Sequence, residues 1–304
     1  MTDLDWETDE LATPVTRDIA QLLRRSGLWG GFDAANLDTG ERIELRPDRL
    51  MPMASVAKLP AALVVLDRFA TGRIDPATPV DLLPADRSPG PTGVSSLEHP
   101  VQMAYGDLVR QSLAVSDNAA ADALFEVCPP REVTRQLRAW GIRGLTLRHP
   151  MRAIHQAMQD FGDPQVALEL TVQAGTDGGG HPISELDARR ANAGSAQALV
   201  HLLKRVWNDD IGAPGVAATL RERLGHKAGR IRMYPDLVTD AVAFRSKTGT
   251  FLNLRHEVGV VETEGQRIAV AALTASLVPA FVQPEAEAAI GQSARWAVEA
   301  LLGI

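Results

Sequence analysis

Both ends of this 304-residue chain show the sequence pattern of β-strands, and this constrains its fold more than any other feature. Short β-rich runs bounded by turn residues occur early and late in the chain, at residues 28–35, 42–45, 241–247, 256–262 and 268–274. Between the two groups, apolar residues recur at helical spacing. The early and late strands can share one sheet only if the middle of the chain is an insertion, so we expect a sheet built from both ends.

Terminal helices complete the expected fold. Thr13 followed by Pro14 is typical of a helix start, and residues 284–302 show the apolar spacing of a helix that closes the chain. The predicted fold class is α/β, as an α+β sandwich: an antiparallel five-stranded sheet flanked by the terminal helices, plus an inserted all-α domain. Residues 1–53 and 227–304 would form a discontinuous α/β domain and residues 54–226 the all-α domain, with the active site in the cleft between them.

Composition excludes several classes of function. The net charge of −7 does not suit a nucleic-acid-binding protein, which is normally basic. The single cysteine, Cys128, allows no intramolecular disulfide, and no His/Cys cluster has metal-ligand spacing, so no metal or other cofactor is expected. No apolar run is long enough for a membrane helix, and the acidic start MTDLDWETDELATP lacks the features of a secretory signal. We therefore expect a cytoplasmic monomer acting on a small molecule.

The first chemical signal is Ser55, which stands three residues before Lys58 where an apolar helical run begins. In a helix these two side chains lie on the same side, about one turn apart, beside the free N–H groups of the helix start. This arrangement suits a serine nucleophile with an amine that takes its proton. The alternative interpretation is a capping serine followed by a lysine in the first turn, which is common in proteins.

Two further short motifs follow the first one. Ser116-Asp117-Asn118 alone indicates a capped helix, and residues 247–250, KTGT, alone indicate a strand that ends in a glycine bulge or turn. Together with S-x-x-K, in this order and spacing, S-D-N and K-T-G form a specific set. On these residues, and on the strands at both ends, the chain resembles the superfamily of class A β-lactamases and penicillin-binding proteins.

The resemblance implies a role for each motif residue. Ser55 would be the nucleophile that forms an acyl-enzyme, and Lys58 would be its base. Ser116 would pass a proton to the leaving group, and Asn118 would hydrogen-bond Lys58 or a substrate amide.

The third motif would form the substrate-binding edge of the sheet. Lys247 would present positive charge to a substrate carboxylate and to the serine of S-D-N. The strand against which substrate lies would consist of Lys247, Thr248, Gly249 and Thr250. The backbone N–H groups of Ser55 and Thr250 would form the oxyanion hole.

Arginines close to the third motif are candidates for binding a substrate carboxylate, because a guanidinium can bind it with two hydrogen bonds. Arg230, Arg232 and Arg255 qualify by position, and each is equally well interpreted as a surface residue. Arg230 is the first choice because the segment GRIRMYPDL resembles the one before the K-T-G strand of class A enzymes.

The chain departs from the class A pattern at one point. Those enzymes carry a water-activating glutamate in E-x-x-L-N between S-D-N and K-T-G, and this pattern is absent here: Glu169 is followed by LTV and Glu185 by LDA. His149, His155 or His181 could replace the glutamate as a base, although each is also interpreted as an ordinary surface or core histidine. Acylation therefore has its residues, while deacylation has no identified base.

Three functions fit these observations. The first is a serine hydrolase that acts through acyl-Ser55 on a β-lactam or a small carboxylate-bearing ester or amide. The second is a DD-peptidase or transacylase that passes the acyl group to an amine. The third is a non-catalytic binding protein that is acylated once by a β-lactam or other acyl ligand and then stops.

Overall fold

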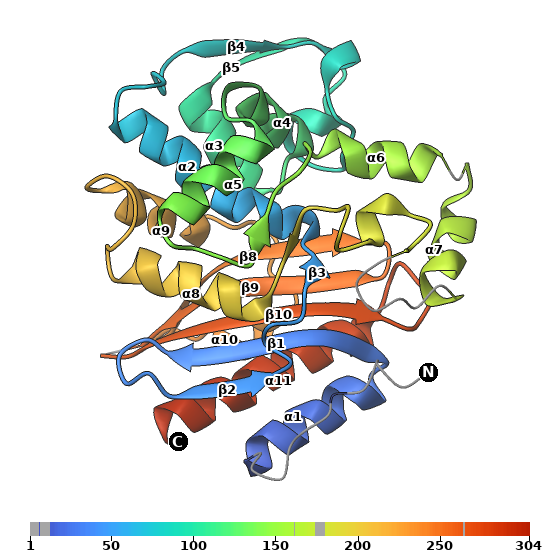
Figure 1. Ribbon diagram of the computed structural model, residues 1–304, viewed down its shortest axis with the longest axis vertical. Helices are drawn as coiled ribbons and strands as arrows, with labels where there is room; N and C mark the ends of the chain where they lie inside the picture. The colour runs from blue at the N-terminus through green and yellow to red at the C-terminus, as the bar shows by residue number, and fades with distance from the viewer. Residues whose placement is uncertain (1–5, 7–12, 161, 174–179, 264) are drawn as a thin grey trace.

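The sheet predicted from both ends of the chain is present in the computed structural model, which describes residues 6, 13–160, 162–173, 180–263 and 265–304 (Figure 1). Its strand order is β2-β1-β10-β9-β8, and all its neighbours are antiparallel. The strands are β1 (Leu28–Asn36), β2 (Arg42–Leu45), β8 (Ala243–Phe251), β9 (Leu254–Glu262) and β10 (Arg267–Ser276). The predicted fold class is thereby confirmed.

The two ends of the chain meet at the centre of the sheet. Strand β1 pairs with β10 over its whole length, from Leu28 opposite Ser276 to Asn36 opposite Ile268. Both faces of this region are covered, and for that reason β1, β9 and β10 are buried at nearly every position. Strand β8 is the edge of the sheet that faces the helical part of the molecule (Figure 1).

The terminal helices α1 (Pro14–Arg25) and α11 (Pro284–Leu302) lie together on one face of the sheet (Figure 1). The Oγ1 of Thr13 accepts a hydrogen bond from the Thr16 N–H at 3.3 Å, so Thr13 caps α1 as its sequence predicts. Apolar side chains of both helices pack on Phe32 and Ala34 of β1 and form one of two hydrophobic cores. The terminal helices therefore support the sheet on the face that is turned away from the helical middle region.

The second core lies between the opposite face of the sheet and the middle of the chain. Helix α8 (Ala196–Trp207) packs directly on the sheet, and α2 (Lys58–Ala70) lies at the centre of the helical region, where it is buried almost all round from Lys58 to Asp67. The other helices of this part are α3 (Tyr105–Ala114), α4 (Asn118–Val127), α5 (Pro130–Ala139), α6 (Arg152–Gln159), α7 (Pro164–Gln173) and α9 (Val216–Gly225). The short helix α10 (Met233–Leu237) instead packs against α11 and belongs to the first core.

The middle of the chain also contains short strands that periodicity did not indicate. Strands β3 (Met51–Pro52), β6 (Leu145–Thr146) and β7 (Ala193–Gly194) form one small sheet, and β4 (Pro79–Leu82) pairs with β5 (Val101–Ala104). Runs of two to four residues are too short to show a period. The exact division into two domains stays a prediction. No helix in the described part of the chain is long and apolar enough to cross a membrane.

Candidate active site

Ser55 lies in a single 3₁₀ turn, η1 (Ala54–Ala57), which leads directly into α2. The preceding residue, Ala54, has φ = 45°, a left-handed conformation that is unfavourable for a residue with a side chain. Such conformations persist only where the surrounding structure holds them in place. The Ser55 hydroxyl is half-buried and has no hydrogen-bond partner among the described residues, so it is free to meet a ligand.

Lys58, the first residue of α2, brings the first two motifs together. Its Nζ donates hydrogen bonds to the Ser116 carbonyl oxygen at 2.5 Å, to Asn118 Oδ1 at 2.7 Å and to Ser116 Oγ at 3.3 Å. The side chain is fully buried. Burial lowers the pKa of Lys58 from 10.5 to about 7, against the opposing influence of Asp117 and Asp122. A substantial neutral fraction near pH 7 is what a lysine base requires.

Asp117 anchors the S-D-N loop. This buried carboxylate caps α4 by accepting hydrogen bonds from the N–H groups of Ala119 and Ala120, and it also accepts one from Val94 N–H at 2.6 Å. Ser116 consequently stands at φ = 59°. Asn118 Nδ2 donates to the Pro89 carbonyl at 2.9 Å, which leaves its Oδ1 aimed at the lysine. Asp117 therefore positions the two residues on either side of it.

Lys247 reaches the same serine from β8. Its Nζ donates to Ser116 Oγ at 2.9 Å and to the Thr248 carbonyl oxygen at 2.8 Å. Burial, with the charges of Lys58, Lys227 and Arg232, lowers the pKa of Lys247 well below its usual value. The Ser116 hydroxyl oxygen thus accepts hydrogen bonds from two amines, so its own proton can be donated to a ligand.

Gly249 lets β8 lie against the turn that carries Ser55. A Cβ atom at this position would stand 2.8 Å from the Met53 carbonyl oxygen and 3.0 Å from Val56 Cγ2. These separations are too short for ordinary packing, so any side chain here would displace the strand or the turn. The glycine of K-T-G is required for close approach, and Thr248 and Thr250 on either side of it are accessible.

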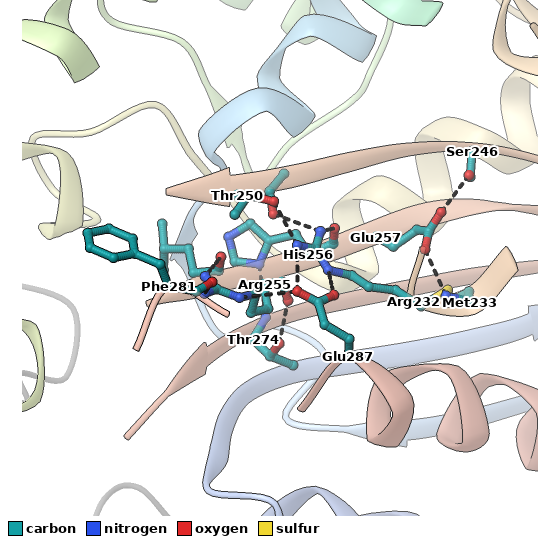
Figure 2. A network of polar contacts seen from close by, with 12 residues as sticks. Arg232, Met233, Ser246, Thr250, Arg255, His256, Glu257, Thr274, Phe281 and Glu287 are labelled. Carbon is teal, nitrogen blue, oxygen red and sulfur yellow. Dashed lines mark hydrogen bonds and ion pairs between the residues drawn. The ribbon is translucent and has the colours of Figure 1, made fainter. Parts of the chain in front are cut away.

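The arginine that supports this strand is Arg232, whereas Arg230 was the first choice from the sequence. Arg232 is buried and donates from Nη1 to the Gly249 carbonyl oxygen at 3.1 Å and from Nη2 to Thr250 Oγ1 at 2.7 Å (Figure 2). It is also ion-paired with Glu287. Arg230 is exposed, and its guanidinium carbon lies 5.0 Å from the centroid of the Tyr234 ring. The third arginine, Arg255, is buried in the same network and does not face the site.

A buried ion pair behind β8 was not predicted at all. Lys227 contacts the Glu257 carboxylate, which also accepts hydrogen bonds from Ser246 Oγ at 2.7 Å and from the Met233 N–H at 2.8 Å (Figure 2). The charge of Lys227 contributes to the lowered pKa of Lys247. Sequence alone gives one weak signal for this pair, a glutamate next to the apolar run of β9.

None of the three histidines considered as a deacylating base has a hydrogen bond to Ser55 or Lys58 within the described residues. His149 Nε2 lies 3.2 Å from the buried Glu185 carboxylate, whose pKa is raised by burial. His181 Nδ1 accepts from the Ile183 N–H, and burial lowers the pKa of this histidine. His155 lines a hollow between α4 and α6. The described part of the chain also holds no group of three metal-ligating side chains.

The chain belongs to the β-lactamase enzyme family, whose model matches residues 14–301. It is a serine β-lactamase-like hydrolase. A β-lactamase regulatory protein of Streptomyces cacaoi, BlaB, is 43% identical over 295 residues, which cover 92% of this chain and 95% of that protein. A β-lactamase of Streptomyces albus G is 34% identical over 134 residues, 42% of each chain.

Solved structures show the same fold at lower identity. The β-lactamase of Sphaerobacter thermophilus superposes with a TM-score of 0.77 at 19% identity, covering 95% of this chain and 97% of that one. The protein PBP-A superposes with a TM-score of 0.76 at 18% identity, covering 96% and 97%. A single-residue mutant of PBP-A has been solved as an acyl-enzyme complex with penicillin G.

Proposed function

We propose that this protein is acylated at Ser55 by a β-lactam, or by a small ester or amide that carries a carboxylate. The observation that supports this most directly is the convergence of Lys58 and Lys247 on the hydroxyl of Ser116. This joins the three motifs into one hydrogen-bonded unit next to a nucleophile with no internal partner among the described residues. The resemblance to the β-lactamase family supports the same choice of ligand.

In the proposed acylation, Lys58 acts in its neutral form. Ser55 Oγ attacks the ligand carbonyl carbon while its proton passes to Lys58 Nζ. The negative charge on the carbonyl oxygen is stabilised by the backbone N–H groups of Ser55 and Thr250. Because Lys58 is buried, its ammonium form is disfavoured and it returns the proton readily.

Ser116 completes the step. The bond from the carbonyl carbon to the leaving nitrogen or oxygen breaks, and that atom takes the Ser116 hydroxyl proton. Ser116 recovers a proton from Lys58, whose Nζ lies 3.3 Å from its Oγ. The proton that left Ser55 therefore reaches the leaving group, and both lysines keep the charge with which they began.

The ligand carboxylate would lie along β8. Lys247 supplies positive charge there, and Thr248 and Thr250 supply hydroxyl donors on the accessible edge. Arg232 donates to Thr250 Oγ1, so the threonine proton must point elsewhere and can meet the carboxylate. We therefore assign the supporting role to Arg232, and the binding of a substrate carboxylate by Arg230 stays a prediction.

A second function is favoured by one specific observation. The E-x-x-L-N glutamate is absent, and no histidine of the described residues is hydrogen-bonded to Ser55 or Lys58, so a long-lived acyl-enzyme is chemically reasonable. A protein that stays acylated would report the presence of a β-lactam instead of destroying it. A relative that is 43% identical is named as a regulatory protein, which is consistent with this alternative.

Intact-protein mass spectrometry distinguishes these functions. The protein is mixed with penicillin G or a chromogenic cephalosporin, and its mass is followed together with the absorbance of the cephalosporin. A transient adduct with continuing turnover supports the hydrolase, and a persistent adduct without turnover supports the binding protein. Ser55→Ala should give neither. An adduct that survives in Ser55→Ala, or no adduct in the unmodified protein with any β-lactam, ester or amide tested, contradicts acylation at Ser55.

A further inference from the structure

His256 occupies a position where the surrounding sequence pattern would place an aliphatic residue. It lies in β9, opposite Gly249 of β8 on one side and Leu273 of β10 on the other. Val258 and Val260, the next residues on the same face of β9, are part of the core beneath the helical region. His256 itself is completely buried. A buried imidazole is costly unless both its nitrogens find partners.

Both ring nitrogens of His256 do have partners. Nδ1 accepts a hydrogen bond from the Thr274 backbone N–H at 3.0 Å (Figure 2), so the ring proton is on Nε2. Nε2 donates to the Pro52 carbonyl oxygen at 2.8 Å. Burial and the charge of Arg232 lower the pKa of His256 to about 3, so the ring remains neutral at ordinary pH. The ring is therefore a fixed bridge with one donor and one acceptor.

This bridge ends three residues before Ser55. Pro52 is followed by Met53, whose N–H donates to the Asn192 carbonyl oxygen at 2.7 Å, and by Ala54 in its left-handed conformation. The strained turn is therefore held from the helical side by a backbone contact and from the sheet by His256. Within the described residues, the bond from His256 to Pro52 is the only hydrogen bond that joins the five-stranded sheet to residues 51–57.

The same ring also touches the strand that carries Thr250. A Cβ atom built on Gly249 would lie 3.2 Å from His256 Cδ2, and Arg232 Nη1 donates to the His256 carbonyl oxygen at 2.5 Å. His256 thus lies beside Gly249 of β8 and, through Nε2, holds the residue two positions before the Ala54–Ala57 turn. The two N–H groups of the proposed oxyanion hole belong to these two segments.

We propose that His256 is a positioning residue that sets the separation between the Ser55 turn and β8, and so keeps the two oxyanion-hole donors in register. The inference rests on the proposed acylation of Ser55. Catalytic groups must be held within about 0.5 Å of their productive geometry, and loss of one oxyanion donor costs about 10²–10³-fold in rate. If the Ser55 turn can move away from β8, Ser55 should be acylated slowly even though the ligand still binds.

Two substitutions separate this role from general support of the core. In His256→Asn the short amide can still accept from the Thr274 N–H, but it cannot reach the Pro52 carbonyl. In His256→Gln the longer amide reaches as far as Nε2 and carries both a donor and an acceptor. Val258→Ala is the matched control, because it removes core volume from the same face of the same strand and takes no hydrogen bond away from residues 51–57.

The measurement is the single-turnover acylation of each variant by a fluorescent penicillin, analysed for the acylation rate constant and the dissociation constant separately. We expect His256→Asn to lower the rate constant by about 10–100-fold while the dissociation constant changes by less than about threefold. His256→Gln should recover most of the rate. Val258→Ala should lose stability yet keep a rate within about threefold of the unmodified protein.

The outcomes separate failure of this inference from failure of the proposed function. If the unmodified protein is acylated at Ser55 and His256→Asn is acylated at the same rate, the positioning role is wrong and the acylation stands. The same conclusion follows if Val258→Ala loses as much rate as His256→Asn, or if a folded His256→Gln shows no recovery. If the unmodified protein forms no adduct, the proposed acylation itself fails. Thermal unfolding of each variant establishes that it is folded.

Discussion

At the scale of single residues, the site depends on removing charged groups from water. Lys58 and Lys247 are both buried and both contact Ser116; burial lowers the pKa of each, and the charge of Lys58 lowers that of Lys247 further. A buried amine is an expensive feature in a folded protein, and here it provides a base that is partly neutral near pH 7. The cost in stability and the proposed activity have the same physical origin.

The pKa of Lys58 predicts how acylation depends on pH. Because only the neutral amine accepts the Ser55 proton, the acylation rate should rise with pH through about 7 and level off above about 8. Below about pH 6 it should fall close to tenfold per pH unit. Stopped-flow acylation by a fluorescent penicillin in buffers of constant ionic strength measures this profile. A rate that stays constant between about pH 5.5 and 8.5 would contradict the role of Lys58 as the base.

At the scale of secondary-structure elements, the decisive contact is between β8 and the η1 turn. The strand is at the edge of the sheet, the turn begins the central helix, and neither segment alone forms the site. Gly249 determines how closely they approach, and His256 and Arg232 hold them from behind. The accuracy of the site therefore comes from packing between elements that are about 200 residues apart in the chain.

A single methyl group tests this contact. Gly249→Ala places a Cβ atom 2.8 Å from the Met53 carbonyl oxygen, so the strand must move away from the turn. We expect acylation to slow by at least about tenfold, with a loss of about 1–3 kcal/mol in the free energy of unfolding. Gly229→Ala is the control, because a Cβ atom there meets nothing within 4 Å. Equal acylation rates for the two variants, measured with the same penicillin, would show that close approach at Gly249 is unimportant.

At the scale of the whole molecule, the sheet made from the two chain ends separates two hydrophobic cores. Strand β1, which lies next to the central strand β10, carries a buried acid, Asp33, next to the partly exposed Arg42. Burial raises the pKa of Asp33 from 3.8 to about 7, although the charge of Arg42 opposes the shift. This carboxyl group links the stability of the entire fold to pH.

Asp33→Asn should therefore stabilise the protein at high pH. Between about pH 4 and 7 the folded chain holds the Asp33 proton more tightly than the unfolded chain, so stability falls as pH rises through this window and the full penalty is present above about pH 7. Asparagine has no such penalty, and we expect a gain on the order of 1–3 kcal/mol at about pH 8 and a smaller gain at about pH 5. Urea unfolding at both pH values measures this gain in the free energy of unfolding, with the exposed Asp240→Asn as control. An equal effect at both values would disprove the linkage.

Local patterns along the chain predict which elements form and which residues carry the proposed chemistry. Strand and helix periods, the Thr13 cap and the turn residues are local signals, so the five strands and the terminal helices could be predicted. The three motifs could be recognised because their residue types and order are specific. They did not reveal the short strands of the middle region, whose pairing depends on distant partners.

The contacts that hold the site in place depend on the folded structure. The sequence could not separate Arg230 from Arg232, since both stand in one irregular segment and only the fold buries one of them beneath Gly249. It gave no sign that His256 bridges to Pro52, 204 residues away. The lowered pKa of Lys58 also depends on its complete burial, which is a property of the folded molecule. Burial and long-range contacts are set by the packing of all elements together, and no local pattern records them.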